Sequence, residues 1–341
     1  MTMTQLDERL GETSVLPAAR RRLHELLGQR FVRTIGVTVI VIAVVAIIAG
    51  LVSHSPDVVW QAIITGLLNG GVYSLIAMGL TLAYGVLHII NFANGSMLTL
   101  GLYLAYVAVH DWGMQPYVAL LFVIPAMMAF GALTQKFLLN PVMNGASHNQ
   151  LLVTIGLAVG LENLILLIAG PNPVSVTLPH GGSFSLFGAT VDLGRLYAFV
   201  GAIAMVVLLS LILQKTPVGT AVRAVAANPV GASLVGVNIK NIYVLTFAIG
   251  GAAIGAAATL IAPFQSITPT TGDVFNLTAF VVVVLGGMGN VAGALVGGFV
   301  VGLTEQLAGI IFPEQSPLLS VFVVFLIVLF IRPRGVFGRA S

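Results

Sequence analysis

The chain has 341 residues, of which 58% are hydrophobic and only 7% are charged, and its mean hydropathy is +1.05. So few charges exclude a soluble globular protein of this length, and most of the surface is therefore expected to face lipid. The formal charge of +3 and the absence of cysteine indicate neither nucleic-acid binding nor a disulfide, a thiolate nucleophile or a cysteine-ligated metal.

An all-α polytopic membrane fold is predicted, because only helices and closed barrels satisfy their own backbone hydrogen bonds inside a bilayer. Barrel strands would alternate apolar and polar residues, whereas residues 35–52 are apolar almost without interruption. Residues 1–33 precede this run and include Arg20, Arg21 and Arg22. They are predicted to form a cytoplasmic tail, either an amphipathic surface helix or a disordered segment, because a signal peptide would carry its apolar run nearer the start.

A spanning helix needs roughly 20 apolar residues, and this length divides residues 34–332 into about ten crossings, some of them broken. Basic residues gather in alternate loops and in both tails, which predicts that both termini, including the second tail at 333–341, are cytoplasmic. Arg195 is the single exception. An even number of crossings requires the run 274–307 to cross twice, with a break at 286–290. The predicted spans are 34–53, 59–84, 97–110, 117–139, 151–170, 196–214, 242–263, 274–307 and 318–331.

The loop 215–241 differs from the other loops in length and in its many small residues. Thr216-Pro217 is typical of a helix start, and Asn228-Pro229 marks a break, because a residue before proline disfavours the α conformation. Two short helices on the cytoplasmic side are therefore predicted. Their small side chains favour close docking against another protein, and a connecting segment without a partner is the alternative.

The stretch "HIINFANGS", residues 88–96, places four polar side chains and a glycine between two apolar runs. It is predicted to be a cytoplasm-facing break whose backbone groups are satisfied by its own amides. Ser96 is expected to cap a helix that begins at Met97. Asn91 and Asn94, together with Ser96, are candidate residues of a substrate pathway.

Further pathway candidates interrupt other spans. Asn69 and Tyr73 lie four residues apart and therefore on one helical face. Glu162 lies past the middle of its predicted span, where a carboxylate costs roughly 2.5–3.5 kcal/mol on insertion scales. It is expected either to line the pathway or to lie near the outer interface. No His, Asp or Glu cluster has metal-ligand spacing, so neither a metal nor a cofactor is predicted.

Four stretches, in the right order from about residue 66 to 339, resemble permease subunits of ABC importers for branched-chain amino acids. They are "INFANG", "GTAVRAVAANPVGASLVGVNIKN", "VVLGGMGNVAGALVGGFVVGLTEQL" and "FIRPRGVFGR". The first stretch is more similar to the first of the two non-identical permeases of such importers. The resemblance implies a transmembrane subunit of the bacterial cytoplasmic (inner) membrane that has no catalytic residues of its own.

The resemblance also implies partners: two ATP-binding subunits, a second and non-identical permease, and an extracytoplasmic substrate-binding protein. The chain contains no Walker A pattern, in agreement with ATP hydrolysis by a partner. Carried over by motif, the positions that couple to the ATP-binding subunits are Arg223, Ala227, Asn228, Ala232 and Gly236.

The chain departs from the family's "INFAHGE" pattern, because Asn94 and Ser96 stand where the family has histidine and an acidic residue. Substrates other than branched-chain amino acids, namely urea, amides or small carboxylates, are therefore alternatives within the same machinery. A different class, an ion-coupled secondary transporter or channel, is the alternative that broken helices and Glu162 also fit. An enzyme is not predicted, since no nucleophile and base pattern is present.

Overall fold

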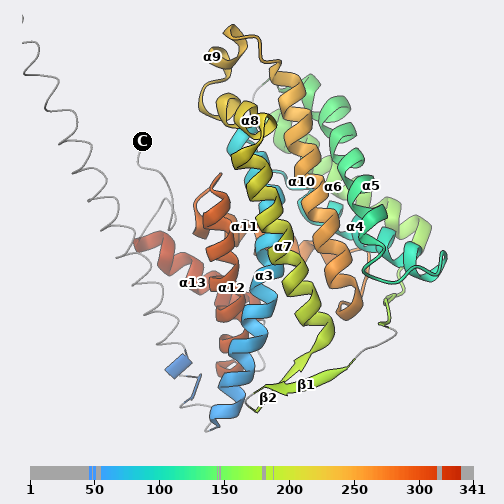
Figure 1. Cartoon of the computed structure of the whole chain (residues 1–341), viewed down its shortest axis with the longest axis vertical. Coiled ribbons are helices and arrows are strands. Elements are labelled where there is room, and N and C mark those ends of the chain that lie inside the picture. Colours follow the sequence, from blue (N-terminus) through green and yellow to red (C-terminus); the bar gives the residue numbers. More distant parts are fainter. Residues whose placement is uncertain are drawn as a thin grey trace, which may run out of the picture. The chain divides into compact units, whose positions relative to one another are not determined.

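Long apolar helices lie side by side and form nearly the whole structure (Figure 1). The computed structural model describes residues 46–47, 49–50, 55–143, 145, 147–178, 182–186, 188–312 and 317–331, all in one unit that extends from Val45 to Ser341. The predicted tails 1–33 and 333–341 and most of the predicted span 34–53 lie outside the described residues. The helices are α3 (Pro56–Leu87), α4 (Asn94–His110), α5 (Leu120–Leu133), α6 (Ser147–Ala169), α7 (Leu193–Lys215), α8 (Pro217–Ala227), α9 (Pro229–Leu234), α10 (Ile239–Ile261), α11 (Thr271–Gly286), α12 (Val291–Ile311) and α13 (Pro317–Ile331).

The predicted all-α membrane architecture is confirmed. Within the described part of the chain, six helices are long and apolar enough to cross a bilayer, and two shorter apolar helices accompany them. The break expected at 286–290 is confirmed, because α11 ends at Gly286 and α12 begins at Val291. Short helical turns continue α5 over Thr134–Leu139 and Asn140–Val142, and continue α10 over Ala262–Phe264.

The loop 215–241 folds into the two short helices that the prolines predict. Thr216 caps α8 by accepting from the Gly219 N–H, and Asn228 caps α9 by accepting from the Gly231 N–H at 2.9 Å. A proline occupies the first turn of each helix, where its missing N–H leaves no bond unmade. We call the end of the bundle that carries α8 and α9 the α8 end (Figure 1).

A small antiparallel hairpin, β1 (Ser183–Leu186) and β2 (Ala189–Asp192), lies at the opposite end and was not predicted. Gln61 of α3 fastens this hairpin through both ends of its amide. Its Oε1 accepts from the Thr190 N–H at 2.7 Å and its Nε2 donates to the Thr190 carbonyl at 2.9 Å. We call this the hairpin end.

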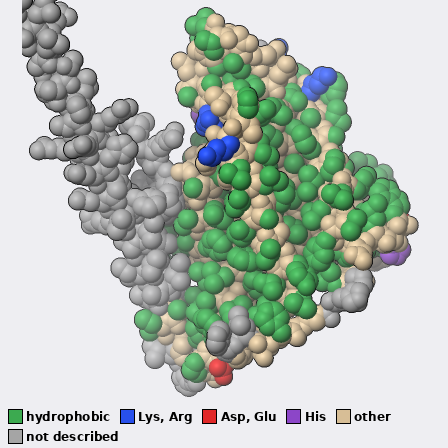
Figure 2. All heavy atoms as spheres, in the orientation of Figure 1, with side chains coloured by type: hydrophobic (Ala, Val, Ile, Leu, Met, Phe, Trp, Pro, Cys, Tyr) green, Lys and Arg blue, Asp and Glu red, His purple; other side chains and the backbone are tan. Residues whose placement is uncertain are grey.

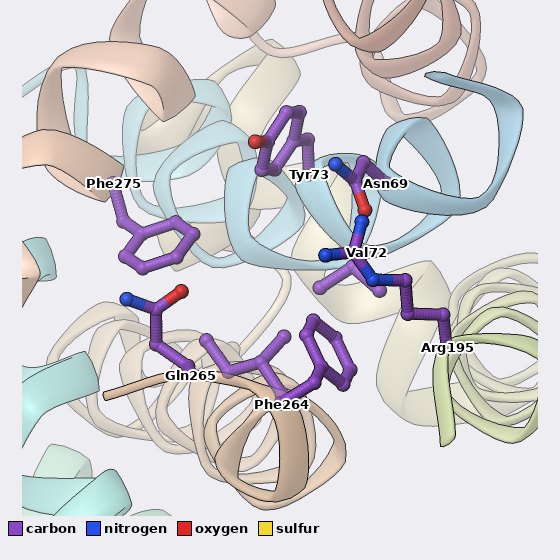
Figure 3. Close-up of a pocket in the computed structure, with 8 residues that line it drawn as sticks. Asn69, Val72, Tyr73, Arg195, Phe264, Gln265 and Phe275 are labelled. Carbon is purple, nitrogen blue, oxygen red and sulfur yellow. The ribbon is translucent and has the colours of Figure 1, made fainter. Parts of the chain in front are cut away.

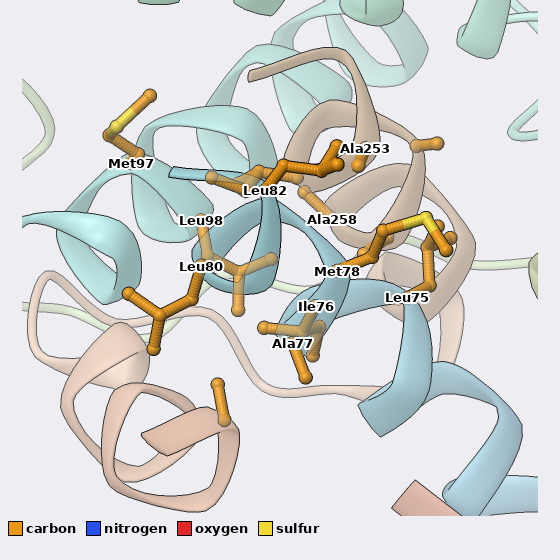
Figure 4. Close-up of a cluster of buried hydrophobic side chains, with 14 of the residues drawn as sticks. Leu75, Ile76, Ala77, Met78, Leu80, Leu82, Met97, Leu98, Ala253 and Ala258 are labelled. Atoms are coloured by element: carbon orange, nitrogen blue, oxygen red, sulfur yellow. The ribbon is translucent and has the colours of Figure 1, made fainter. Parts of the chain in front are cut away.

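The hydrophobic core surrounds α3 and α10, which are the most buried of the long helices, whereas α6 is the least buried. Figure 4 shows buried side chains of α3 (Leu75, Ile76, Met78 and Leu82), α4 (Met97 and Leu98) and α10 (Ala253 and Ala258) in one cluster. The exposed face is also largely hydrophobic, with Lys and Arg side chains gathered toward the α8 end (Figure 2). Such a surface is the one expected of a protein whose solvent is lipid.

Backbone contact between glycines joins α3 to α12. A Cβ at Gly302 would lie 2.4 Å from the Gly66 carbonyl oxygen and 2.7 Å from the Gly70 Cα. A Cβ at Gly298 would lie 2.7 Å from the Gly70 carbonyl oxygen. Small residues allow this approach, which supplies the van der Waals contact that holds helices together in lipid.

We therefore expect Gly302→Ala to lower the free energy of unfolding by about 1–3 kcal/mol, because the added methyl group forces the two backbones apart. The measurement is thermal unfolding of the purified protein in detergent. Gly309→Ala is the matched control, since it lies on the same helix and its Cβ would meet nothing within 4 Å. Equal unfolding temperatures for the two variants would contradict the prediction.

Candidate functional site

A polar pocket of about 80 Å³ lies toward the hairpin end of the bundle (Figure 3). Two of the predicted pathway residues, Asn69 and Tyr73, both line it from α3, as their spacing requires. Three further elements contribute to the wall: the start of α7, the end of α10 with the residues that follow, and α11. The other lining residues are Val72, Arg195, Ile261, Phe264, Gln265 and Phe275.

The pocket combines charge with apolar walls. The Arg195 guanidinium lies 5.6 Å from the centre of the Phe264 ring, a cation–π distance. Tyr73 and Phe275 pack edge to face with ring centres 6.2 Å apart. Glu305 of α12 lies near Tyr73, close enough for the two side chains to interact electrostatically, and Arg195 lies within range of the same hydroxyl.

One carboxyl oxygen of Glu305 is buried and has no hydrogen-bond partner among the described residues. A buried carboxylate without full pairing is costly, and such groups mark functional sites in membrane proteins more often than structural ones. Within the described part of the chain, the pocket therefore brings a cation, a neighbouring carboxyl, two amides and a phenol close to four apolar side chains.

Arg195 is a residue that the pathway prediction missed. It is positioned by the local sequence, because the Asp192 carboxylate accepts from the Arg195 N–H at 3.0 Å and so caps the first turn of α7. The sequence did carry a signal for it, since Arg195 is the one basic residue that violates the predicted distribution of charge across the membrane. The predicted pathway residues also did not include Glu305 or Gln265.

The segment after α3 runs back into the bundle instead of turning at its surface. Gly85, in the last turn of α3, lies against Gly289, just beyond the end of α11. Gly95, in the first turn of α4, lies against Gly272, at the beginning of α11. The 16 residues of α11 correspond to about 24 Å. The predicted break between two helices is therefore present, but residues 88–93 extend along much of the length of α11 as non-helical chain.

Side chains satisfy the backbone of this re-entrant segment, as predicted, but only one of them belongs to it. The Asn91 Oδ1 atom accepts from the Ala93 N–H at 3.1 Å. Asn276 of α11 was not predicted to take part. It bonds to the backbone on both sides of the turn at residues 92 and 93. Its Oδ1 accepts from the Gly95 N–H at 3.3 Å and its Nδ2 donates to the Phe92 carbonyl at 3.1 Å. Thr99 adds a third link by accepting from the Gly272 N–H at 2.9 Å.

Ser96 does not cap a helix at Met97, so that prediction is wrong. Helix α4 begins at Asn94, and Ser96 lies inside its first turn. The helix starts earlier because the Asn276 Oδ1 atom accepts a hydrogen bond from the Gly95 N–H. This bond satisfies a free N–H of the first turn, as a capping side chain would. Asn94 is completely buried, and neither atom of its amide has a partner among the described residues.

Glu162 does not join the polar pocket. It is half-buried on α6, whose neighbouring side chains Leu167 and Ile168 are 83% and 76% exposed. It also does not line the larger cavity beneath α8. Within the described residues, no three His, Asp or Glu side chains gather in a way that could hold a metal ion.

The predicted coupling positions lie at the α8 end. Ala232 is the buried residue of α9, whereas Ala227 and Asn228 are exposed, and Gly236 has the left-handed φ of 87° that favours glycine. The guanidinium of Arg223 donates to the Leu213 carbonyl and to the Thr220 hydroxyl, which ties α8 to the end of α7. Three apolar side chains of this region are strongly exposed: Val230, Leu234 and Val235.

Comparisons with known proteins place this geometry in context. Residues 62–331 match the family model described as "Branched-chain amino acid transport system / permease component". The high-affinity branched-chain amino acid transport system permease protein BraD of Pseudomonas aeruginosa is 30% identical over 297 residues, which cover 82% of this chain and 95% of that protein. The permease protein LivH of Escherichia coli (strain K12) is 29% identical over 293 residues, with the same two coverages. The probable LivH permease of Methanocaldococcus jannaschii is 30% identical over 247 residues, covering 68% of this chain and 76% of that protein.

The bonds made by Asn276 generate a prediction. Asn276→Ala leaves the partly buried Gly95 N–H and Phe92 carbonyl without this partner, at a cost of up to about 1–3 kcal/mol for each group. We expect faster hydrogen exchange over residues 92–96 and a lower unfolding temperature. Hydrogen exchange followed by mass spectrometry measures the first effect and thermal unfolding the second.

Asn163→Ala is the matched control, because that exposed amide bonds only to the Val159 carbonyl of its own helix. Unchanged exchange over residues 92–96 in Asn276→Ala would show that the bonds to α11 do not hold the re-entrant segment.

Proposed function

Because the chain belongs to the family of permease components of branched-chain amino acid transport systems, we propose that it forms half of an alternating-access pathway for these amino acids. The proposed assembly is an ABC importer in which the chain pairs with a second, non-identical permease. Two ATP-binding subunits and an extracytoplasmic binding protein complete it. The chain itself does not hydrolyse ATP.

The chemistry of the polar pocket carries the substrate proposal. A branched-chain amino acid is a zwitterion with an apolar side chain, so its site needs a cation, hydrogen-bond acceptors and an apolar wall. Arg195 offers the guanidinium for the carboxylate. The amide oxygens of Asn69 and Gln265, and Tyr73 with its neighbour Glu305, suit the ammonium group. The apolar wall consists of Val72, Ile261, Phe264 and Phe275.

Urea and simple amides have no carboxylate for Arg195, and small carboxylates have no ammonium group for the acceptors. The combination therefore supports an amino acid over the other substrates considered for this machinery. Asn91, Asn94 and Ser96 stay candidate pathway residues, since the re-entrant segment places their side chains inside the bundle.

We place the α8 end in the cytoplasm, with both termini, the tails 1–33 and 333–341, and the loop 215–241. The Lys and Arg side chains gathered toward that end support this orientation (Figure 2). The exposed Val230, Leu234 and Val235 then form an apolar surface in water, where a partner is needed to cover it. We propose that the ATP-binding subunits dock there and move α8 and α9, and through Arg223 also the end of α7.

The first test concerns the substrate. In the assembled importer, Glu305→Gln should weaken leucine uptake about tenfold or more, since a charged hydrogen-bond partner contributes ~1.5–3 kcal/mol. The effect should appear in KM more than in the ATPase rate. Uptake of labelled leucine into proteoliposomes is the measurement.

Glu162→Gln is the matched control for this test, because Glu162 lies on α6 away from the pocket. Two outcomes would sink the proposal: normal uptake by the Glu305→Gln variant, or abolition of uptake by Glu162→Gln together with a proton or sodium requirement. The second outcome would favour an ion-coupled transporter.

The second test concerns docking. Leu234→Asp should prevent the ATP-binding subunits from co-purifying with the permease, because it places a charge in the apolar contact. Asn241→Asp adds the same charge at another exposed position of the α8 end and should leave the complex intact. Equal recovery of the ATP-binding subunits with both variants would exclude α9 as the docking surface.

A further inference from the structure

A second and larger cavity, which we call the α8 cleft, opens beneath α8 and has a volume of about 650 Å³. Its walls are the last turns of α3 and α7, the inner side of α8, and the start of α12. It lies at the C-terminal end of α3, whereas residues at the middle of that helix line the polar pocket. Its polar lining residues are Thr81, Tyr84, His88, Ser210, Gln214, Arg223 and Asn290.

The charges of the α8 cleft favour an anion. Arg223 and His88 line it, and none of its lining residues is Asp or Glu. Arg223 makes two hydrogen bonds, to the Leu213 carbonyl and the Thr220 hydroxyl, which leaves part of its set of five N–H donors for a ligand. Val291 and Ala292 bring the N-terminal turn of α12 into the same wall, and a helix N-terminus carries partial positive charge.

Thr81 supplies an independent observation. Its side chain is 1% exposed, it lines the cleft, and its hydroxyl has no hydrogen-bond partner among the described residues. Other buried threonines of the bundle bond to the carbonyl four residues earlier: Thr246 to Ile242 at 2.8 Å, and Thr259 to Gly255 at 2.9 Å. Buried hydroxyls rarely stay unpaired, and a molecule in the cleft that reached the Thr81 hydroxyl would supply the partner it lacks.

We propose that the α8 cleft is a binding site for an oxyanion, held by Thr81, His88 and Arg223. The oxyanion is either the carboxylate of an amino acid on the cytoplasmic side or the phosphate of a phospholipid head group. Because Arg223 also ties α8 to α7, a ligand bound to it links the core of the bundle to the helix that meets the ATP-binding subunits. Occupancy of the cleft therefore restrains the movement of α8.

The amino-acid source rests on the proposed function, whereas the phospholipid source does not. The phospholipid arm also separates this inference from the polar pocket, whose proposed ligand is an amino acid. Failure of the leucine-uptake test would leave the lipid part of this inference intact.

The test uses the full chain in nanodiscs of phosphatidylcholine, with and without phosphatidylglycerol, and with L-leucine or L-leucinamide added. The ligand-dependent rise in unfolding temperature gives an apparent affinity for each condition. We expect a rise with phosphatidylglycerol or with L-leucine, and none with L-leucinamide, which lacks the carboxylate. Hydrogen exchange over α8 should slow under the same conditions.

Thr81→Val is the decisive variant, because it is isosteric and removes a hydroxyl that has no partner in the free protein. Its unfolding temperature without ligand should equal or exceed that of the wild type. Its apparent affinity for the oxyanion should fall about tenfold. Thr246→Val, equally buried but outside the cleft, should keep the wild-type affinity.

A response to phosphatidylglycerol alone identifies a lipid head group as the ligand. A response to L-leucine identifies the amino acid if Thr81→Val weakens it and Thr246→Val does not, because leucine bound only in the polar pocket would be unaffected by either variant. The inference is overturned if neither ligand raises the unfolding temperature or slows exchange in α8. It is equally overturned if Thr81→Val and Thr246→Val bind the oxyanion with the same affinity.

Discussion

Every backbone N–H and carbonyl inside an apolar bundle needs a partner, and this requirement decides what the chain can do between α3 and α4. A helix satisfies itself, but residues 88–93 are not helical and run into the interior. Asn91 and Asn276 supply partners for the backbone where this segment enters α4, at the Phe92 carbonyl and at the N–H groups of Ala93 and Gly95. The irregular segment exists because two amides, 185 positions apart in the sequence, meet at the same turn.

Close helix packing places the chemical groups of the polar pocket. The contacts of Gly66 and Gly70 with Gly298 and Gly302 fix how α3 lies along α12. Tyr73 follows Gly70 by three residues and Glu305 follows Gly302 by three, which is nearly one helical turn in each case. The glycines thereby set the distance between the phenol and the carboxyl, so residues without side chains determine the electrostatics of the pocket.

Hydropathy and turn residues were sufficient to predict much of this architecture. Apolar runs predicted the helices, proline and asparagine predicted the division of α8 from α9, and glycine predicted the break before α12. These features are local. The roles of Asn276 and Gln61 could not be read in the same way, because each depends on a partner from a distant element. Ser96 is an example: its residue type favours a capping role, but the Asn276 amide from α11 bonds to the start of α4 instead.

The unbroken helix α3 contributes residues to the hairpin contact, to the polar pocket and to the α8 cleft. The 32 residues of α3 extend about 48 Å. Gln61, near its beginning, holds the hairpin; Asn69 and Tyr73 line the polar pocket; Thr81 and Tyr84 line the α8 cleft. A tilt or axial shift of this single rod moves all of these positions at once. Movement of α3 at the hairpin and movement of α3 under α8 are therefore displacements of one continuous helix.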